Sequence, residues 1–260
     1  KLAFGDSLYL QISLDNEDWY QASAKAGQLG GYLISIDNEQ EQIFLVKEIG
    51  TYVSHIVTGM SDLNVDGIYQ KPDGSPLTYS NFLPGYPYPW GVDQPSAWAL
   101  VVTRTHFAPW EYDWSVGQWY SPSATDTLST SEIDQVSGEF NIGAYAEIPL
   151  SLSITRQGEV KEGAGVFTTS INLSAGTTAT GNLAEGVPVY WQIDGITQDD
   201  LASGELQGFG VINGGKLDIQ HSLKIDGDSG DQFQVSVYSD SARTQKIGAT
   251  STASVQESAS

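Results

Sequence analysis

The pattern of apolar and polar residues changes near residue 150. Before that point it predicts alternating strands and helices. We expect strands over 4–13 and 31–36, and helices from the segment around Trp19 to Gly30 and from Glu39 to Gly50. Between about residues 57 and 121 the periodicity disappears, and Gly, Pro and aromatic residues become frequent. Because a long irregular segment inside a compact domain is usually functional, any binding site is expected there.

After Pro149 the pattern consists of β-rich runs separated by turn residues, with no helical period. These runs cover 151–156, 166–174, 187–193, 215–225, 231–239 and 246–255. Alternation places Val187, Val189, Trp191 and Ile193 on one face of a strand, and Phe233, Val235 and Val237 on one face of another. Two such faces are what an antiparallel β-sandwich needs for its core. We therefore expect two domains, an α+β domain over 1–149 and an all-β, Ig-like sandwich over 150–260.

The composition limits the classes of partner that the chain is expected to bind. The chain has 11 Lys and Arg against 32 Asp and Glu, a formal net charge of −21. Such a surface repels nucleic-acid phosphates and anionic lipid and attracts divalent cations. The absence of cysteine excludes disulfides, thiolate zinc sites and cysteine nucleophiles. No apolar run approaches a membrane span, and the start at Lys1 has no signal-peptide pattern, so we expect part of a longer polypeptide.

The stretch SIDNEQEQIF, residues 35–44, allows two interpretations. Asp37 followed by Gln40 has the form of a capping box, and Glu39 and Glu41 suit the first turn of a helix. The same density of acids is also what half of a metal site requires.

The first half resembles the C-type lectin-like domain over nearly all of residues 4–149. The motifs occur in family order: the Trp19 helix, GGYLISI, the segment from Gly59 to Pro87, and then WALVV, GQWYS and GAYAEIP. The resemblance implies a non-catalytic module for adhesion or recognition of a protein or glycan, located outside the cell or on its surface. The family's usual disulfides are missing, which is similar to the cysteine-free members found in large bacterial surface proteins.

Sugar-binding members of this family hold calcium in the long loop, on side chains beside a proline and after a tryptophan. Here Tyr86 and Tyr88 flank Pro87, and Tyr120-Ser121 follow Trp119, so the usual oxygen ligands are replaced. We expect contact by aromatic residues instead, and the candidate ligand-binding residues are Tyr86, Tyr88, Trp90, Asp93, Trp110 and Tyr112. Two alternatives stay open: a calcium-dependent, carbohydrate-binding lectin that uses Asp93 and neighbouring acids, and a structural spacer whose loop aromatics are buried.

The same resemblance implies a structural calcium site at the base of the second helix. Ser35, Asp37, Glu41 and Glu147 match the family's ligands in spacing and place. This interpretation is compatible with the capping box, because Asp37 can cap with one oxygen and coordinate with the other.

The second half resembles Calx-β modules, which recur in long secreted bacterial proteins. The residues that carry the resemblance are VKEGAGV, YWQIDGI, LQGFGVINGG and IDGDSGDQFQVSVYSD. It implies structural calcium at one end of the sandwich, held by Glu162, Asp226, Asp228 and Asp231, with Asp199 and Asp200 as possible further ligands. The alternative for DGDSGD is an ordinary polar turn.

Catalysis is not expected. The chain has three histidines, and His221 lies between Ile219 and Leu223 in strand alternation, which favours a core or strand-end position. No GxSxG, HExxH, P-loop or GxGxxG motif occurs in a suitable context. Acid pairs such as Glu111 and Asp113 could in principle cleave glycosides, but adjacent acids in an acidic loop are a weak signal.

Overall fold

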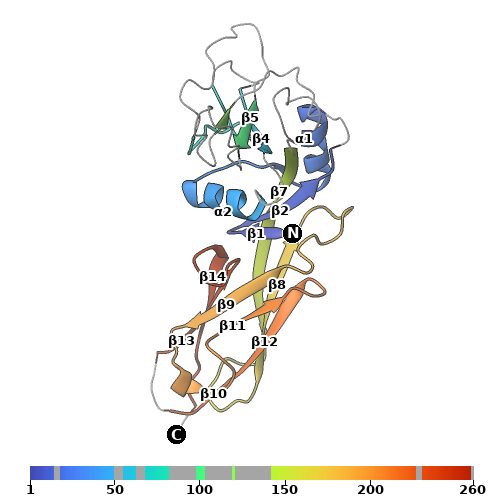
Figure 1. The fold of residues 1–260 in the computed structure, drawn as a ribbon. Coiled ribbons are helices and arrows are strands. Elements are labelled where there is room, and N and C mark those ends of the chain that lie inside the picture. The colour runs from blue at the N-terminus through green and yellow to red at the C-terminus, as the bar shows by residue number, and fades with distance from the viewer. Residues whose placement is uncertain are drawn as a thin grey trace. The chain divides into compact units, whose positions relative to one another are not determined.

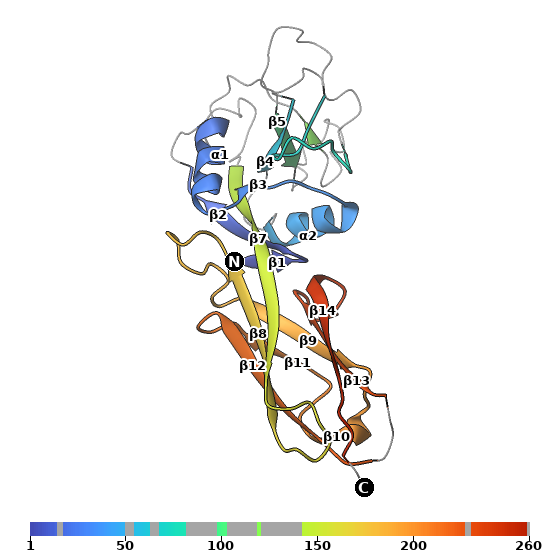
Figure 2. The same cartoon turned by 180° about the vertical axis from the view of Figure 1, so that it is seen from behind.

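The computed structural model describes residues 1–14, 18–49, 55–62, 68–81, 98–102, 119–120, 142–226 and 230–258 (Figures 1 and 2). The chain divides into two compact units. The first unit comprises Lys1–Leu2 and Tyr9–Ile148, and the second comprises Ala3–Leu8 and Pro149–Ser260. Within the described ranges, no helix combines the length and the apolar character needed to cross a bilayer.

Helix α1, Trp19–Gln28, confirms the first predicted helix. Its N-cap is Asp18, whose Oδ1 accepts from the Gln21 amide at 2.8 Å, while Gln21 Oε1 accepts from the Asp18 amide at 2.9 Å. This reciprocal pair is a capping box and satisfies two amides at the helix start. Ala22 and Ala26, one turn apart, are fully buried, so α1 packs through the face that the spacing predicts.

Helix α2, Glu39–Ile49, confirms the second predicted helix, but the predicted capping residue is wrong by one position. Asn38, not Asp37, supplies the cap, because its Oδ1 accepts from the Glu41 amide at 2.9 Å. Asp37 lies one residue before this cap and two residues before the first helical residue, and its own amide donates to Glu41 Oε2 at 2.8 Å. This leaves the Asp37 carboxylate available for contacts outside the helix.

The strands in the first half of the chain differ from the prediction near the N-terminus. The single strand expected over 4–13 is a hairpin of β1, Leu2–Phe4, and β2, Ser7–Ile12, which turns at Gly5 with a φ of +54°. The strand expected over 31–36 is regular only in β3, Tyr32–Leu33. β4, His55–Ser61, was not anticipated from periodicity; it pairs antiparallel with β5, Trp98–Val102, and parallel with β7, Ile142–Gln157. The remaining strand of this sheet is β6, Trp119–Tyr120, which pairs with β5.

The second unit contains strands and one short 3-10 helix. Its strands after β7 are β8 (Phe167–Ala175), β9 (Pro188–Asp194), β10 (Leu201–Ser203), β11 (Gln207–Val211), β12 (Lys216–Leu223), β13 (Gln232–Tyr238) and β14 (Lys246–Ser254). The 3-10 helix η1 spans Gln198–Asp200 and lies in a half where no helix was expected. The strands form two antiparallel sets, β10-β12-β8-β7 and β11-β9-β13-β14.

Aromatic side chains from the two sets meet in a shared core. The ring of Phe167 on β8 lies 5.0 Å from that of Phe233 on β13, and the His221 ring on β12 lies 5.8 Å from that of Trp191 on β9. The predicted inner faces of β9 and β13 are confirmed, since all seven residues named for them are at most 7% exposed. The prediction of a core position for His221 is also correct, since it is 1% exposed.

Candidate functional site

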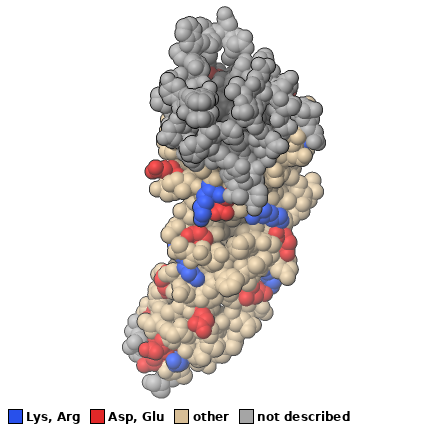
Figure 3. All heavy atoms as spheres, viewed as in Figure 1, with Lys and Arg blue, Asp and Glu red and all other residues tan. Residues whose placement is uncertain are grey.

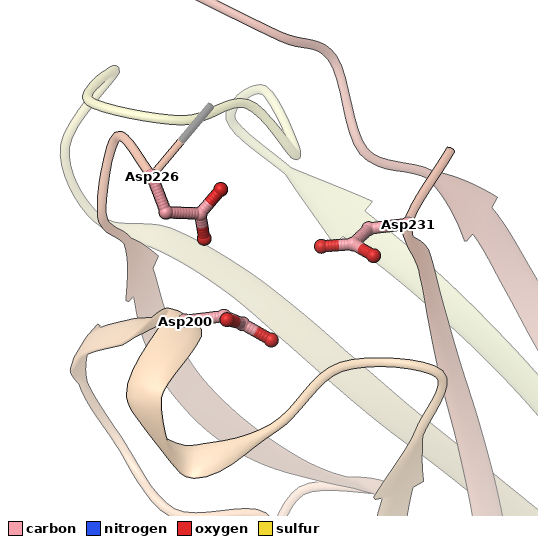
Figure 4. A group of neighbouring side chains, drawn as sticks. All are labelled: Asp200, Asp226 and Asp231. Atoms are coloured by element: carbon pink, nitrogen blue, oxygen red, sulfur yellow. The ribbon is translucent and has the colours of Figure 1, made fainter. Parts of the chain in front are cut away.

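Three acidic side chains converge at one end of the second unit (Figure 4). Asp200 ends η1, Asp226 follows β12, and Asp231 precedes β13. Each offers a carboxylate oxygen, and these oxygens lie within 4.8 Å of one another. Of the acidic and histidine side chains in the described residues, this is the one group of three that meets such a distance. Oxygen ligands from separate segments at this spacing suit a calcium ion.

Backbone hydrogen bonds hold these three segments in place. The Lys224 amide donates to Asp200 O at 2.8 Å, which joins the end of β12 to η1. The Val255 amide donates to Asp231 O at 2.9 Å, which joins the residue after β14 to the start of β13. The carboxylate of Asp200 is itself oriented, because its Oδ2 accepts from the Thr197 amide at 2.6 Å. The spacing of the acids is therefore set by the sheets and not by a single flexible turn.

Glu162 adds a buried carboxylate beside this group. It is 2% exposed, and its backbone is fixed because its amide donates to Gln256 O at 3.0 Å. Burial is the largest cause that raises the pKa of Glu162; the Ser258 amide lowers it, and the carboxyl groups of Asp226 and Glu257 raise it further. The two charged neighbours named here, Asp226 and Glu257, are both acidic. A nearby cation would compensate the whole group, because opposite charge favours the ionised form.

The sequence predicts four acidic calcium ligands at this end of the second unit. The structure places Asp226 and Asp231 together and Glu162 beside Asp226, whereas Asp228 lies outside the described residues. Asp200, named only as a possible partner, belongs to the group of three, and Asp199 does not. The signal that distinguishes them is local, since the Asp200 carboxylate accepts hydrogen bonds from the amide and the hydroxyl of Thr197, three residues earlier.

The four residues predicted for a calcium site in the first unit are linked by hydrogen bonds. Glu147 Oε2 accepts from the Ser35 amide at 3.0 Å, and Ser35 Oγ donates to Asp37 Oδ1 at 3.4 Å. The Asp37 amide reaches Glu41 Oε2, and Glu41 Oε1 accepts from the Tyr9 hydroxyl at 2.5 Å. Ser35, Glu41 and Glu147 are each at most 6% exposed. The four side chains thus form one polar cluster at the start of α2.

A lysine supplies the positive charge in this cluster. Lys71 Nζ lies 2.8 Å from Asp37 Oδ1, and the Lys71 side chain is only 16% exposed. Burial raises the pKa of Glu41, while the hydrogen bond from Tyr9 lowers it. Burial also raises the pKa of Tyr32, with a further contribution from the carboxylate of Glu147. The donor set is rich in oxygen, but several of its oxygens already accept hydrogen bonds and one faces an ammonium group.

The predicted ligand-binding residues of the long loop cannot be placed. Tyr86, Tyr88, Trp90, Asp93, Trp110 and Tyr112 all lie outside the described residues. The strands that border these segments are described: β4 and β5 pair with each other, and β5 pairs with β6.

Comparisons with known proteins found no protein-family profile that matches the chain. The mouse low affinity immunoglobulin epsilon Fc receptor is 42% identical over 72 residues, which is 28% of this chain and 21% of the receptor. A perlucin-like protein of Mytilus galloprovincialis is 33% identical over 80 residues, 29% of this chain and 51% of that protein. Human C-type mannose receptor 2 is 33% identical over 100 residues, 38% of this chain and 6% of the receptor. The chain therefore spans about half or less of each of these relatives.

Solved structures of carbohydrate-recognition domains are also similar. The domain of the mouse scavenger receptor C-type lectin has a TM-score of 0.41 and 21% identity, covering 56% of this chain and 93% of that chain. The cow domain of CD23, crystallised in the presence of an oligosaccharide, has a TM-score of 0.38 and 23% identity, covering 55% of this chain and 88% of that chain. The comparisons support a C-type lectin-like domain in this chain. They do not address the Calx-β resemblance of residues 150–260 or a bacterial source, and both stay predictions.

Proposed function

We propose that this chain is a non-catalytic recognition module that binds a glycan or a cell-surface protein through the long loop of its lectin-like domain, outside the cell or on its surface. The observation that carries the proposal is the similarity to C-type lectin-like proteins, which include receptors. One of these relatives is an immunoglobulin epsilon Fc receptor and another is a mannose receptor, and those ligands belong to the relatives. The composition agrees with a protein or glycan partner, because a net charge of −21 disfavours nucleic acid and anionic membrane.

We further propose that calcium is a structural ion of the second unit. Asp200, Asp226 and Asp231 would hold it, with Glu162 beside them and Asp228 as a further candidate. The support is the distance of at most 4.8 Å between the carboxylate oxygens and the acidic surroundings of a buried Glu162. The ion would neutralise these charges and join segments that are far apart in the sequence, in a chain that has no disulfides. This donor set agrees with the predicted Ig-like or Calx-β-like sandwich.

Calcium at Ser35, Asp37, Glu41 and Glu147 also stays a proposal, but the residues present fit it less well. Lys71 already pairs with Asp37 at 2.8 Å, so an ion there requires displacement of the ammonium group. We therefore assign the stronger calcium dependence to the second unit.

A glycan and cell-binding screen tests the recognition proposal. The chain is compared with a Tyr88→Ala, Trp90→Ala double variant, in calcium and in chelator. We expect the double variant to lose binding and the binding of the unchanged chain to survive chelation. Tyr20→Ala is the matched control, since Tyr20 is an aromatic residue on α1 that is 54% exposed and lies outside the loop.

The same screen separates the alternatives. Binding that disappears in chelator and in an Asp93→Asn variant supports a calcium-dependent lectin instead. A double variant that binds like the unchanged chain places the recognition surface elsewhere. Absence of any binding, together with protection of Tyr88 and Trp90 from modification by solvent reagents, supports a structural spacer.

A further inference from the structure

β11 is the edge strand of its sheet and carries an exposed apolar surface. It pairs with β9, and no second strand pairs with it among the described residues. Phe209 is 74% exposed and Val211 is 49% exposed, although both lie within a regular strand. The centroid of the Phe209 ring lies 6.2 Å from that of the Tyr190 ring on the neighbouring strand, and the two rings are tilted by 32°. Large apolar side chains on an open edge are unusual in a soluble protein, because such an edge can pair with another strand.

The inward positions of β11 explain why this strand lies close against the core. A Cβ at Gly208 would lie 2.4 Å from Trp191 Cζ2, and one at Gly210 would lie 2.6 Å from Leu217 Cδ1. A larger residue at either position requires the Trp191 ring or the Leu217 side chain to move. Arg243 strengthens the attachment, since its Nη2 donates to Gly208 O and its Nε donates to Trp191 O, both at 3.2 Å. The strand is therefore held firmly, with Phe209 and Val211 directed outward.

The backbone of β11 has a free edge in regular register. Leu206 O accepts from the Ile193 amide at 2.6 Å, and the Ile212 amide donates to Val187 O at 3.0 Å, so even-numbered residues bond toward β9. Backbone groups alternate in direction along a strand. The amides and carbonyls of Gln207, Phe209 and Val211 therefore point to the open side.

Two other edge strands of this unit, β14 and β10, carry features that discourage pairing, and β11 does not. β14 begins with Lys246, and its pairing with β13 contains a register shift. β10 is three residues long and also has a register shift. Short edges, lysines and irregularities are common protections of an edge. The segment 207–211 has no charge, no proline and a continuous register with β9.

We propose that β11 is a self-association surface, and that it pairs antiparallel with β11 of a second copy about a two-fold axis at Phe209. In that register the backbone groups of Gln207, Phe209 and Val211 that point to the open side of one copy meet those of the second copy. Phe209 faces Phe209 of the second copy, each Gly208 faces a Gly210, and each Gln207 faces a Val211. A two-fold interface uses the same patch on both subunits, which an identical strand satisfies. No like charges oppose each other, because these five residues are uncharged.

The charge of the whole chain sets the conditions for this pairing. Two copies of net charge −21 repel one another, so dimerisation should strengthen with salt. On the face drawn in Figure 3, the charged side chains of the second unit are scattered among uncharged residues. Repulsion is therefore spread over the surface and is not focused in a single acidic patch on this face.

The absence of cysteine allows a direct test of the register. In a hydrogen-bonded antiparallel pair, facing Cα atoms and facing Cβ atoms both lie about 5.5 Å apart, which is long for a direct disulfide but within reach of a short bismaleimide cross-linker. A Phe209→Cys variant of the full chain should therefore form a covalent dimer with such a cross-linker. Val211→Cys is the matched control, because its own copy would lie about 13 Å away along the paired strands. A mixture of Val211→Cys and Gln207→Cys chains should cross-link with each other.

Sedimentation equilibrium of the unchanged chain provides the independent measurement. We expect a dimer whose dissociation constant falls with added salt, and a loss of dimer in Phe209→Lys, which places two ammonium groups on the axis. Circular dichroism verifies that this variant keeps its fold. A chain that stays monomeric up to its solubility limit overturns the proposal. Equal cross-linking of Phe209→Cys and Val211→Cys overturns the register, and a dimer unaffected by Phe209→Lys places the interface elsewhere.

Discussion

Replacement of Asp226 by asparagine is expected to remove most of the calcium-dependent stability of the second unit. The carboxylate oxygens of Asp200, Asp226 and Asp231 lie within 4.8 Å of one another. Two unit charges at that separation repel by about 1 kcal/mol in water and by about 3.5 kcal/mol at an effective dielectric constant near 20. Without an ion these repulsions oppose folding, and a bound calcium ion turns each carboxylate into a stabilising ligand.

The size of the effect follows from binding linkage. An ion that binds only the folded state stabilises it by about 2.7 kcal/mol at 100 times its dissociation constant. In a domain of about 100 residues, one kcal/mol shifts the melting temperature by several degrees. Calcium should therefore raise the melting temperature of the second unit by about 10 °C or more over its value in chelator.

The pH dependence of the free energy of unfolding gives a second test of the calcium site. Acidification should raise this free energy in chelator and lower it in calcium. Burial raises the pKa of Glu162 in the folded state above its ordinary value of 4.5. In chelator, the folded state therefore binds a proton first, and the free energy of unfolding rises as pH falls from the raised pKa toward 4.5. In calcium, protons compete with the ion, so the same decrease in pH should lower stability. Glu162→Gln should flatten the profile in chelator.

Differential scanning calorimetry of the full chain, in calcium and in chelator, measures these shifts. Hydrogen exchange of residues 150–258 assigns them to the second unit. Asp194→Asn is the matched control, since Asp194 is an exposed acid on β9 outside the group of three and asparagine can still accept the hydrogen bond from Gln192. An unchanged chain that melts at one temperature in both conditions refutes the calcium proposal. An Asp226→Asn variant that keeps the full shift refutes the role of this group.

Three further predictions concern the described core and cluster. Burial lowers the pKa of His221, so the unfolded state binds a proton before the folded state does as the pH falls. The free energy of unfolding should therefore decrease below pH 6.5, the ordinary pKa of histidine. Urea denaturation in excess calcium should show this decrease in the unchanged chain and not in a His221→Phe variant. Gly27 lies inside α1 and has nothing within 4 Å of a new Cβ, so Gly27→Ala should raise the free energy of unfolding by about 0.5–1 kcal/mol. A Cβ at Gly31 would lie 2.1 Å from Glu147 O, so Gly31→Ala should lower it by about 2 kcal/mol or more. Equal melting temperatures of the two variants would contradict this prediction. Lys71→Ala removes the ammonium group beside Asp37, so the stability of the first unit should then depend on calcium. Hydrogen exchange at the start of α2 measures this dependence. If the exchange of the variant is identical in calcium and in chelator, no ion replaces the ammonium group.

Local elements were predictable because their causes lie within a few residues. The spacing of Trp19, Ala22 and Ala26 predicts α1, since one face of a helix must be apolar to pack. The alternation from Val187 to Ile193 predicts β9, since successive side chains of a strand point to opposite faces. The start of α2 at Glu39 was also predicted, and only the cap differs: Asn38 takes the role that was given to Asp37, and both residues have a short polar side chain that suits it.

Pairings between distant segments were not predictable from periodicity. The parallel pairing of β4 with β7 joins His55 to Ile142, and no local pattern specifies that contact. β11 was missed because Gly208 and Gly210 remove its inward side chains, and the reason for those glycines, the side chains of Trp191 and Leu217, is visible only in three dimensions.

The same distinction between local chemistry and long-range assembly applies to the candidate sites. The sequence by itself determined which residues can serve as oxygen ligands, because carboxylates, hydroxyls and amides have fixed chemistry wherever they lie. Only the tertiary structure decided which of them meet: Asp200 joins Asp226 and Asp231 across three segments, and Lys71 reaches Asp37 from a separate turn. The physical reason is that a ligand set depends on distances of a few ångströms, and those distances are fixed by strand register and core packing, which couple residues far apart in the chain.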